Sequence, residues 1–182
     1  MAVLAKLVSA LALIPALVAG ITVPGADTPL FYLVATGPDS AGVNFLPVRL
    51  HGGSPNYSSI LTGNGPIGKF FLTQGVLVSL DPSGSTLYPR PVVNSVLTAN
   101  GCSTYGTLGF VQGASSNKCA RYSTFQIQSN PENAQLGAKL TLNWVGGFYV
   151  CGVNKEVVYK VSPGDGPTEC TPIDLYTVPV VE

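Results

Sequence analysis

Residues 146–161, GGFYVCGVNKEVVYKV, bring a cysteine, a lysine–glutamate pair and three aromatic side chains into one short β-like run. A thiol near a carboxylate could be an activated nucleophile, or the cysteine could be half of a disulfide. A papain-like nucleophile needs a free thiol beside an imidazole, and His51 is the only histidine of the chain. A zinc cluster is disfavoured too, because no two cysteines have C-x-x-C spacing. We therefore interpret Cys151 as structural.

The chain contains four cysteines: Cys102, Cys119, Cys151 and Cys170. Because the first twenty residues have the composition of a secretory signal, an even number of cysteines indicates disulfides, here with three formally possible pairings. The pairing Cys102–Cys119 and Cys151–Cys170 is favoured, because each pair brackets one turn-rich segment. Closing loops of this length is expected to stabilise the fold by roughly 3 kcal/mol each in the chain-entropy description.

The carboxylates form no recognisable catalytic pair. A glycosidase needs two of them facing each other across roughly 5–9.5 Å. Asp81 and Asp165 lie in turn sequences, and Glu156 is expected on a solvated strand face, although its convergence with Glu169 is left open. His51 is not accompanied by a G-x-S-x-G motif. We therefore expect a protein that is not an enzyme and that has no cofactor and no metal site.

Aromatic side chains favour sugar binding as the alternative function. Tyr57, Tyr88 and Tyr105 lie at predicted turns and could be exposed, which would suit a lectin-like module. Trp144 is expected in the core instead, because a strand is predicted over 139–144 in which it shares one face with Leu140 and Leu142. Tyrosines at turns more often pack over loops than bind ligands.

One modification signal is present. Asn56 opens the sequence NYS, an Asn-x-Ser acceptor for N-glycosylation, and it lies among Gly, Ser and Pro residues. No other asparagine has Ser or Thr two residues later. The sequence therefore predicts a glycan on Asn56, in a surface loop.

The strand pattern predicts an all-β fold. Short apolar or alternating runs are separated by turn signals, with 21 Gly and 15 Pro in the chain. We expect an antiparallel β-sandwich or barrel of about 10–12 short strands. The clearest hairpin is SLDPSGSTLY (79–88), and in EVVYKV (156–161) Glu156 and Lys160 are expected to face water. The segment 131–139 could supply one short helical turn.

The first twenty residues are typical of a secretory signal peptide, with one lysine, an apolar run too short to span a bilayer, and small residues at its end. We predict cleavage after Gly20, with Ala19 and Ala26 as alternative positions, and favour cleavage over an N-terminal membrane anchor. Residues 21–182 then form a single disulfide-linked β domain without membrane attachment. Its eight basic and nine acidic residues give a formal charge of 8 − 9 = −1. This near-neutral balance excludes an electrostatic footprint for nucleic acid.

Four stretches carry a resemblance to a known family: FYLVATG, DPSGSTLY, YGTLGFVQ and the late GGFYVCG…EVVYKV…C. Together they resemble the PhiA-type fungal cell-wall proteins, a group that is similar to secreted immunomodulatory glycoproteins of bracket fungi. The resemblance implies a secreted or cell-wall protein without catalysis, sometimes an allergen or a stimulator of immune cells. Its partners would be a host immune-cell receptor or a cell-wall glycan, with a homodimer built on exposed strand edges as one possible assembly.

Overall fold

The computed structural model describes residues 20–130 and 136–181, and this part of the chain is all-β, as predicted. Its only helical element is the 3-10 helix η1 (Asp39–Ala41). The predicted signal peptide (apart from Gly20) and most of the predicted turn at 131–139 lie outside the described residues. The strands are β1 (Phe31–Thr36), β2 (Arg49–Gly53), β3 (Asn56–Ile60), β4 (Phe70–Thr73), β5 (Val76–Ser79), β6 (Arg90–Thr98), β7 (Gly101–Val111), β8 (Ala120–Arg121), β9 (Phe125–Gln128), β10 (Lys139–Leu142), β11 (Gly147–Cys151), β12 (Glu156–Lys160) and β13 (Cys170–Pro179).

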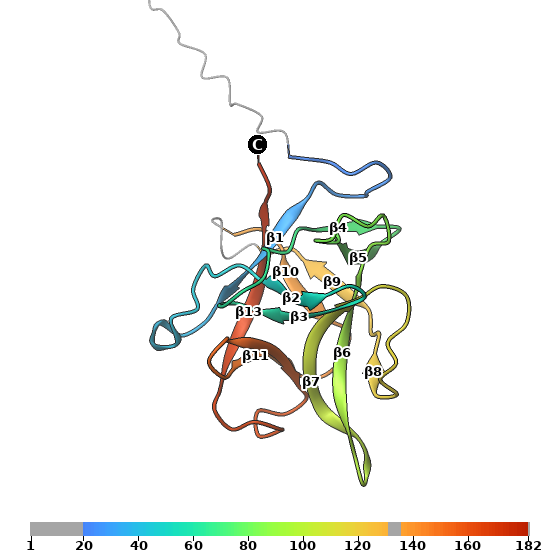
Figure 1. Cartoon of the computed structure of the whole chain (residues 1–182). Helices are drawn as coiled ribbons and strands as arrows, with labels where there is room; N and C mark the ends of the chain where they lie inside the picture. The colour runs from blue at the N-terminus through green and yellow to red at the C-terminus, as the bar shows by residue number, and fades with distance from the viewer. Residues whose placement is uncertain (1–19, 131–135, 182) are drawn as a thin grey trace, which may run out of the picture.

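The strands form one antiparallel sheet that folds over itself like a sandwich (Figure 1). Their order is β5-β4-β1-β13-β11-β12-β3-β7-β6-β8, with β2 beside β3 and with β10 joining β13 to β9. The two ends of this order, β5 and β8, are not paired with each other. The sheet is therefore not closed into a barrel, and the sandwich is the alternative that the structure adopts.

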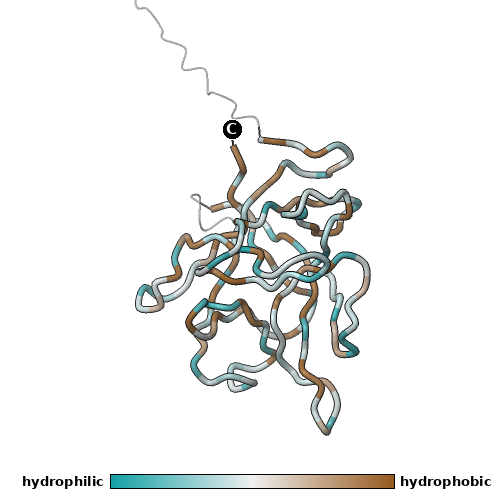
Figure 2. The backbone as a smooth tube through the Cα atoms, in the orientation of Figure 1, coloured by the Kyte–Doolittle hydropathy of each residue, from teal (hydrophilic) through white to brown (hydrophobic). Residues whose placement is uncertain are grey.

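The core lies between the facing parts of this sheet. Phe70 on β4 packs its ring 5.1 Å from Phe110 on β7 and 6.4 Å from Phe31 on β1, so one aromatic side chain links three strands. Hydrophobic residues recur along the strands of the body, whereas many of the loops are paler or hydrophilic (Figure 2). Burial of alternating apolar positions is thus the main force that holds the layers together.

The predicted hairpin at residues 79–88 is wrong in one respect. Its turn forms, with the Gly84 amide donating to the Asp81 carbonyl over 3.0 Å. However, no ladder joins β5 to β6 after the turn, although the Ser79 amide at the end of β5 donates to the Pro89 carbonyl just before β6. Pro89 and Pro91 lack an N–H, so the hairpin lacks the bonds that these two amides would donate to β5.

Candidate functional site

A hollow of about 240 Å³ opens where the sheet does not close. We call it the seam hollow. It is lined by residues 75–77 of β5 and its preceding turn, by residues 90–91 at the start of β6, and by residues 122–125, which lead from β8 into the first residue of β9. Three segments far apart in the sequence therefore meet at one opening of the molecule.

The turn before β5 sets which of its backbone groups point towards β6. The β4–β5 turn has two residues, Gln74 and Gly75, both with positive φ, and Thr73 pairs with Val76. In such a hairpin the N–H and C=O of Leu77 point away from β4, towards the edge that also bears the Ser79 amide. The position opposite Leu77 in an antiparallel continuation is Pro91, which has no N–H to offer.

Arg90 and Tyr122 form the most distinctive pair of side chains in the seam hollow. The guanidinium carbon of Arg90 lies 4.4 Å from the centroid of the Tyr122 ring, a cation–π contact. Arg90 Nε donates to the Gly113 carbonyl over 3.0 Å, and the Tyr122 hydroxyl accepts a bond from the Ser115 amide. Both side chains are thus held in place by the loop before β8, while 39% of Tyr122 stays exposed.

The tyrosines named from the sequence are less suited to binding. Tyr57 is buried, because it faces the core from β3. Tyr88 is 39% exposed, but its ring packs edge-on against Phe71 at 5.0 Å. Tyr105 is half-buried, with its ring in tight contact with Gly166. Tyr122 was missed, since nothing in ARYSTF marks it as the residue next to a gap between strands.

Trp144 lies at the edge of the core rather than within it. The strand predicted over 139–144 ends at Leu142, so the alternation that placed Trp144 inside stops before it. The indole is half-buried, stacked on Tyr159 at 5.4 Å and covered by the Arg121 guanidinium at 4.2 Å. These contacts leave it a poor platform for a sugar.

Asp81 belongs to a buried hydrogen-bond network that is structural in character. It accepts bonds from the Tyr57 hydroxyl at 2.5 Å, from Ser83, and from Gln112 Nε2 at 2.6 Å. Burial alone would raise the pKa of Asp81, but the bonds from Ser83, Tyr57 and Gln112 lower it to about 2. Burial, with the bond to Asp81 as a further cause, raises the pKa of Tyr57. The carboxylate thereby joins the 81–84 turn to β3 and to the end of β7.

A second hollow, of about 290 Å³, contains the residues from which a hydrolase would have to be built. His51, Ser58 and Glu156 all line it, and Glu169 does not. Burial raises the pKa of Glu156, and charge on His51 opposes that rise. His51 Nδ1 lies 2.8 Å from the Asn64 carbonyl, so it donates there, and the Ser58 hydroxyl reaches the His51 carbonyl at 3.5 Å. The bonds of a Ser-His-acid relay, from serine to imidazole and from imidazole to carboxylate, are not formed between these residues.

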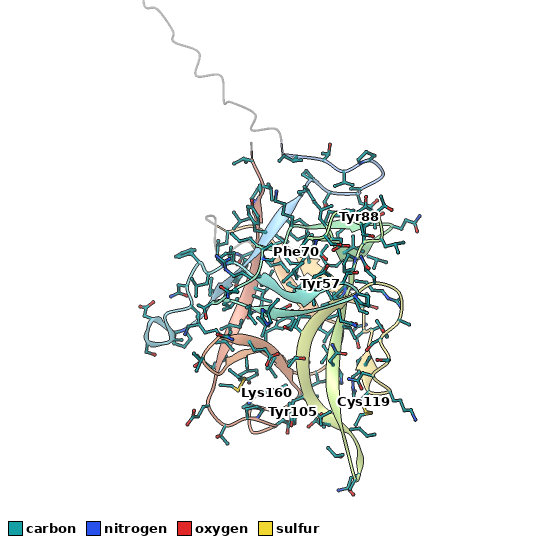
Figure 3. All side chains as sticks on the ribbon, viewed as in Figure 1. Tyr57, Phe70, Tyr88, Tyr105, Cys119 and Lys160 are labelled. Carbon is teal, nitrogen blue, oxygen red and sulfur yellow. A yellow bond between two sulfur atoms is a disulfide. The ribbon has the colours of Figure 1, made fainter. Side chains whose placement is uncertain are left out.

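The prediction that Lys160 faces water from β12 is wrong. It is 1% exposed, with Nζ donating to the Pro167 carbonyl at 2.5 Å and lying 5.2 Å from the Tyr149 ring centroid. The segment 161–169 folds over this face of the sheet and covers Lys160, close to Tyr105 (Figure 3). Glu156, at the other end of the same strand, is half-buried.

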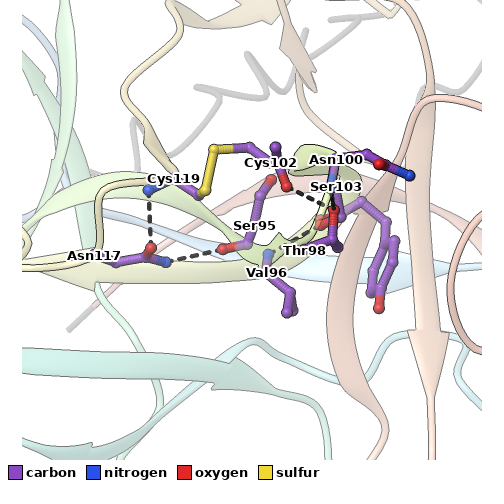
Figure 4. Close-up of a disulfide and its surroundings, with 10 residues drawn as sticks. Ser95, Val96, Thr98, Asn100, Cys102, Ser103, Asn117 and Cys119 are labelled. Atoms are coloured by element: carbon purple, nitrogen blue, oxygen red, sulfur yellow. Dashed lines mark hydrogen bonds between the residues drawn. A yellow bond between two sulfur atoms is a disulfide. The ribbon is translucent and has the colours of Figure 1, made fainter.

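The cysteines are crosslinked in the favoured pairing, and none is free in the described part of the chain. Cys151 lies directly opposite Cys170 on adjacent strands β11 and β13. Cys102 joins the start of β7 to Cys119 in the loop before β8 (Figure 4). Asn117 supports that loop, because its side chain accepts from the Cys119 amide and donates to the Ser95 carbonyl (Figure 4).

Asn56 is exposed at the first position of β3, opposite Gly53 at the end of β2. This is a strand end rather than the loop that was predicted, and glycosylation there stays a prediction. Among the described residues no three His, Cys, Asp or Glu side chains are grouped to hold a metal. No helix of residues 20–130 or 136–181 is long and apolar enough to cross a bilayer.

Comparison with known protein families, curated proteins and solved structures gives no match.

Proposed function

We propose that the chain is a secreted, non-enzymatic glycoprotein of the fungal cell wall that acts by binding saccharide. The observation that carries this proposal is the Arg90–Tyr122 pair, held by backbone bonds at the mouth of the seam hollow. Sugar sites combine an aromatic surface with a few fixed polar groups, and the seam hollow offers both. The cell-wall setting is supported by the resemblance to PhiA-type proteins.

Recognition is favoured over hydrolysis by the geometry around His51. A relay needs its serine and carboxylate on the imidazole nitrogens, whereas His51 Nδ1 is engaged by the Asn64 carbonyl. The two disulfides fit an oxidising environment such as the extracellular space.

Retention on polysaccharides tests the binding proposal. Purified protein would be passed over chitin, β-glucan, mannan and whole fungal wall, with Tyr122→Ala as the test variant. Tyr88→Ala is the matched control, since both tyrosines are 39% exposed and only Tyr122 lines the hollow. We expect retention that Tyr122→Ala abolishes and Tyr88→Ala preserves. Passage of the wild type through every matrix would refute the proposal.

Secretion and glycosylation are tested by expression in a fungal host followed by mass analysis. Expression in a fungal host should release protein that starts after Gly20 and that loses mass on treatment with peptide N-glycosidase. The Asn56→Gln variant should be secreted without the mass of the glycan, because Asn56 lies in the only Asn-x-Ser/Thr sequence of the chain. An unchanged mass after treatment of the wild type would rule out the glycan.

Immune stimulation is the second candidate, and the β6–β7 hairpin favours it. This hairpin extends away from the body of the molecule (Figure 1), and Val96 and Leu97 near its tip are 51% and 65% exposed. Exposed apolar side chains on a rigid projection suit a receptor, or a second copy joined through strand edges. Endotoxin-free protein should raise cytokine output from macrophages, and Leu97→Ser should lower that response. A flat response to the wild type would exclude this activity.

A further inference from the structure

We infer that the seam hollow takes one ring of an acidic saccharide, with its carboxylate bound by Arg90. This inference rests on the proposed saccharide binding and names the class of sugar. It follows from the charge in the hollow, the free donors of Arg90, the exposed hydroxyl of Thr124 and the volume available.

Charge in the hollow comes from Arg90 alone. The other residues that line it, at positions 75–77, 91 and 122–125, carry no ionisable group except the Tyr122 phenol. No described carboxylate lies within salt-bridge distance of Arg90, since the ion pair between described residues is Lys139–Asp174. An unpaired guanidinium in a cavity favours a ligand that brings the opposite charge.

The donors of Arg90 are free and fixed in position. Its Nε is used by the Gly113 carbonyl, and its terminal nitrogens bond to none of the described residues. Contact with the Tyr122 ring and the Nε bond restrict the side chain before any ligand arrives. A guanidinium restricted in this way can bind a planar carboxylate through two parallel hydrogen bonds, which a lysine cannot do.

Polar groups on the segment 122–125 suit the hydroxyls of a sugar. Thr124 contributes an exposed hydroxyl to the hollow. This hydroxyl and the terminal nitrogens of Arg90 can bond ring hydroxyls, while the Tyr122 ring contacts an apolar face of the sugar.

The volume favours one sugar ring over a longer segment. At about 240 Å³ the hollow is smaller than the roughly 300–1,000 Å³ that encloses a drug-sized ligand. One uronate ring would occupy it, with the rest of the oligosaccharide outside in solvent.

Calorimetry with short, matched oligosaccharides tests the inference. The probes are an oligomer of galacturonate, its neutral galactose counterpart and a sulfated galactose oligomer. We expect the uronate to bind at least about tenfold more tightly than either of the other two, and its affinity to fall as salt is added. Arg90→Gln should weaken uronate binding by at least about tenfold, and Arg90→Lys should restore only part of it.

Arg121→Gln is the matched control, because Arg121 also lies over an aromatic ring but outside the hollow. It should bind uronate like the wild type, and melting curves should show that every variant is folded. Equal binding of the neutral oligomer, or full binding by Arg90→Gln, would overturn the inference while leaving saccharide binding in place. Tighter binding of the sulfated probe would show that the hollow selects a sulfate rather than a carboxylate, and this result would also overturn the inference. Binding of no saccharide would overturn both proposals.

Discussion

The Ser79 amide donates a 2.9 Å hydrogen bond to the Pro89 carbonyl, and beyond this bond β5 and β6 lie close together without forming a ladder. The next antiparallel position would join Leu77 to Pro91, where the missing N–H prevents the exchange of bonds. Two prolines in the sequence PRP (89–91) thus remove the donors that a β5–β6 ladder would need, at the place where the seam hollow opens.

Replacing Pro91 by valine should close part of this gap. The new amide can donate to the Leu77 carbonyl, so the β5–β6 ladder should gain a position and the hollow should lose volume. Hydrogen exchange should show a protected amide at position 91, and saccharide retention should fall. Pro163→Val, in the exposed segment between β12 and β13, should change neither quantity. A fast-exchanging amide at position 91 would show that proline is not what holds the seam open.

The Asp81 network predicts a specific acid sensitivity. The pKa of Asp81 is about 2 in the folded protein, below its ordinary value of 3.8, so its stabilisation is complete above pH 4 and is lost as the pH falls towards 2. Asp81→Asn should flatten the decline of unfolding free energy across that window, as measured by urea titration at each pH. An equally steep decline in the variant would place the acid-sensitive group elsewhere.

Removing the Tyr57 hydroxyl, which donates to Asp81, gives an independent check of the Asp81 network. Tyr57→Phe should cost about 1–2 kcal/mol of unfolding free energy, because a buried carboxylate oxygen loses a charge-assisted hydrogen bond. Tyr176→Phe is the control, since the Tyr176 hydroxyl makes no hydrogen bond to the described residues. Equal costs for both variants would mean that the bond to Asp81 contributes nothing.

Each disulfide should contribute separately to stability. The double variants Cys102→Ala/Cys119→Ala and Cys151→Ala/Cys170→Ala should each lose about 3 kcal/mol, because both crosslinks close loops of similar length. Iodoacetamide should add no mass to the native protein and four adducts after reduction and unfolding. Labelling of native Cys151 would contradict its structural role.

Local sequence signals predicted the all-β fold and the cysteine pairing well. Alternating runs and turn residues report the existence of strands directly, and each cysteine pair closes one local segment that is visible in the sequence. The turn at 81–84 was also predictable, because Asp81, Pro82 and Gly84 suit its geometry.

Features set by distant segments were not predictable in this way. Lys160 alternates as if it faced water, but the 161–169 segment covers it. Tyr57 follows a turn signal, yet its strand presents it to Asp81 across the core. The Arg90–Tyr122 pair joins residues 32 positions apart, and only the strand order brings them together.

The bond from Lys160 to Pro167 should hold the 161–169 segment against the sheet. Lys160→Met keeps most of the packing volume but removes this bond, so it should cost about 1–2 kcal/mol and expose the segment to limited proteolysis. Lys118→Met, at an exposed position, should leave both quantities unchanged. Equal protease resistance of wild type and Lys160→Met would show that other contacts hold the segment.

The most direct test of saccharide binding at the seam is an amide NMR titration of the ¹⁵N-labelled protein with an oligouronate. The account predicts that shifts concentrate at residues 75–77, Arg90 and 122–125, the three segments that line the seam hollow. Shifts centred on His51, Ser58 and Glu156 would place the ligand in the hollow that these three residues line, and they would contradict the assignment of the site to the seam.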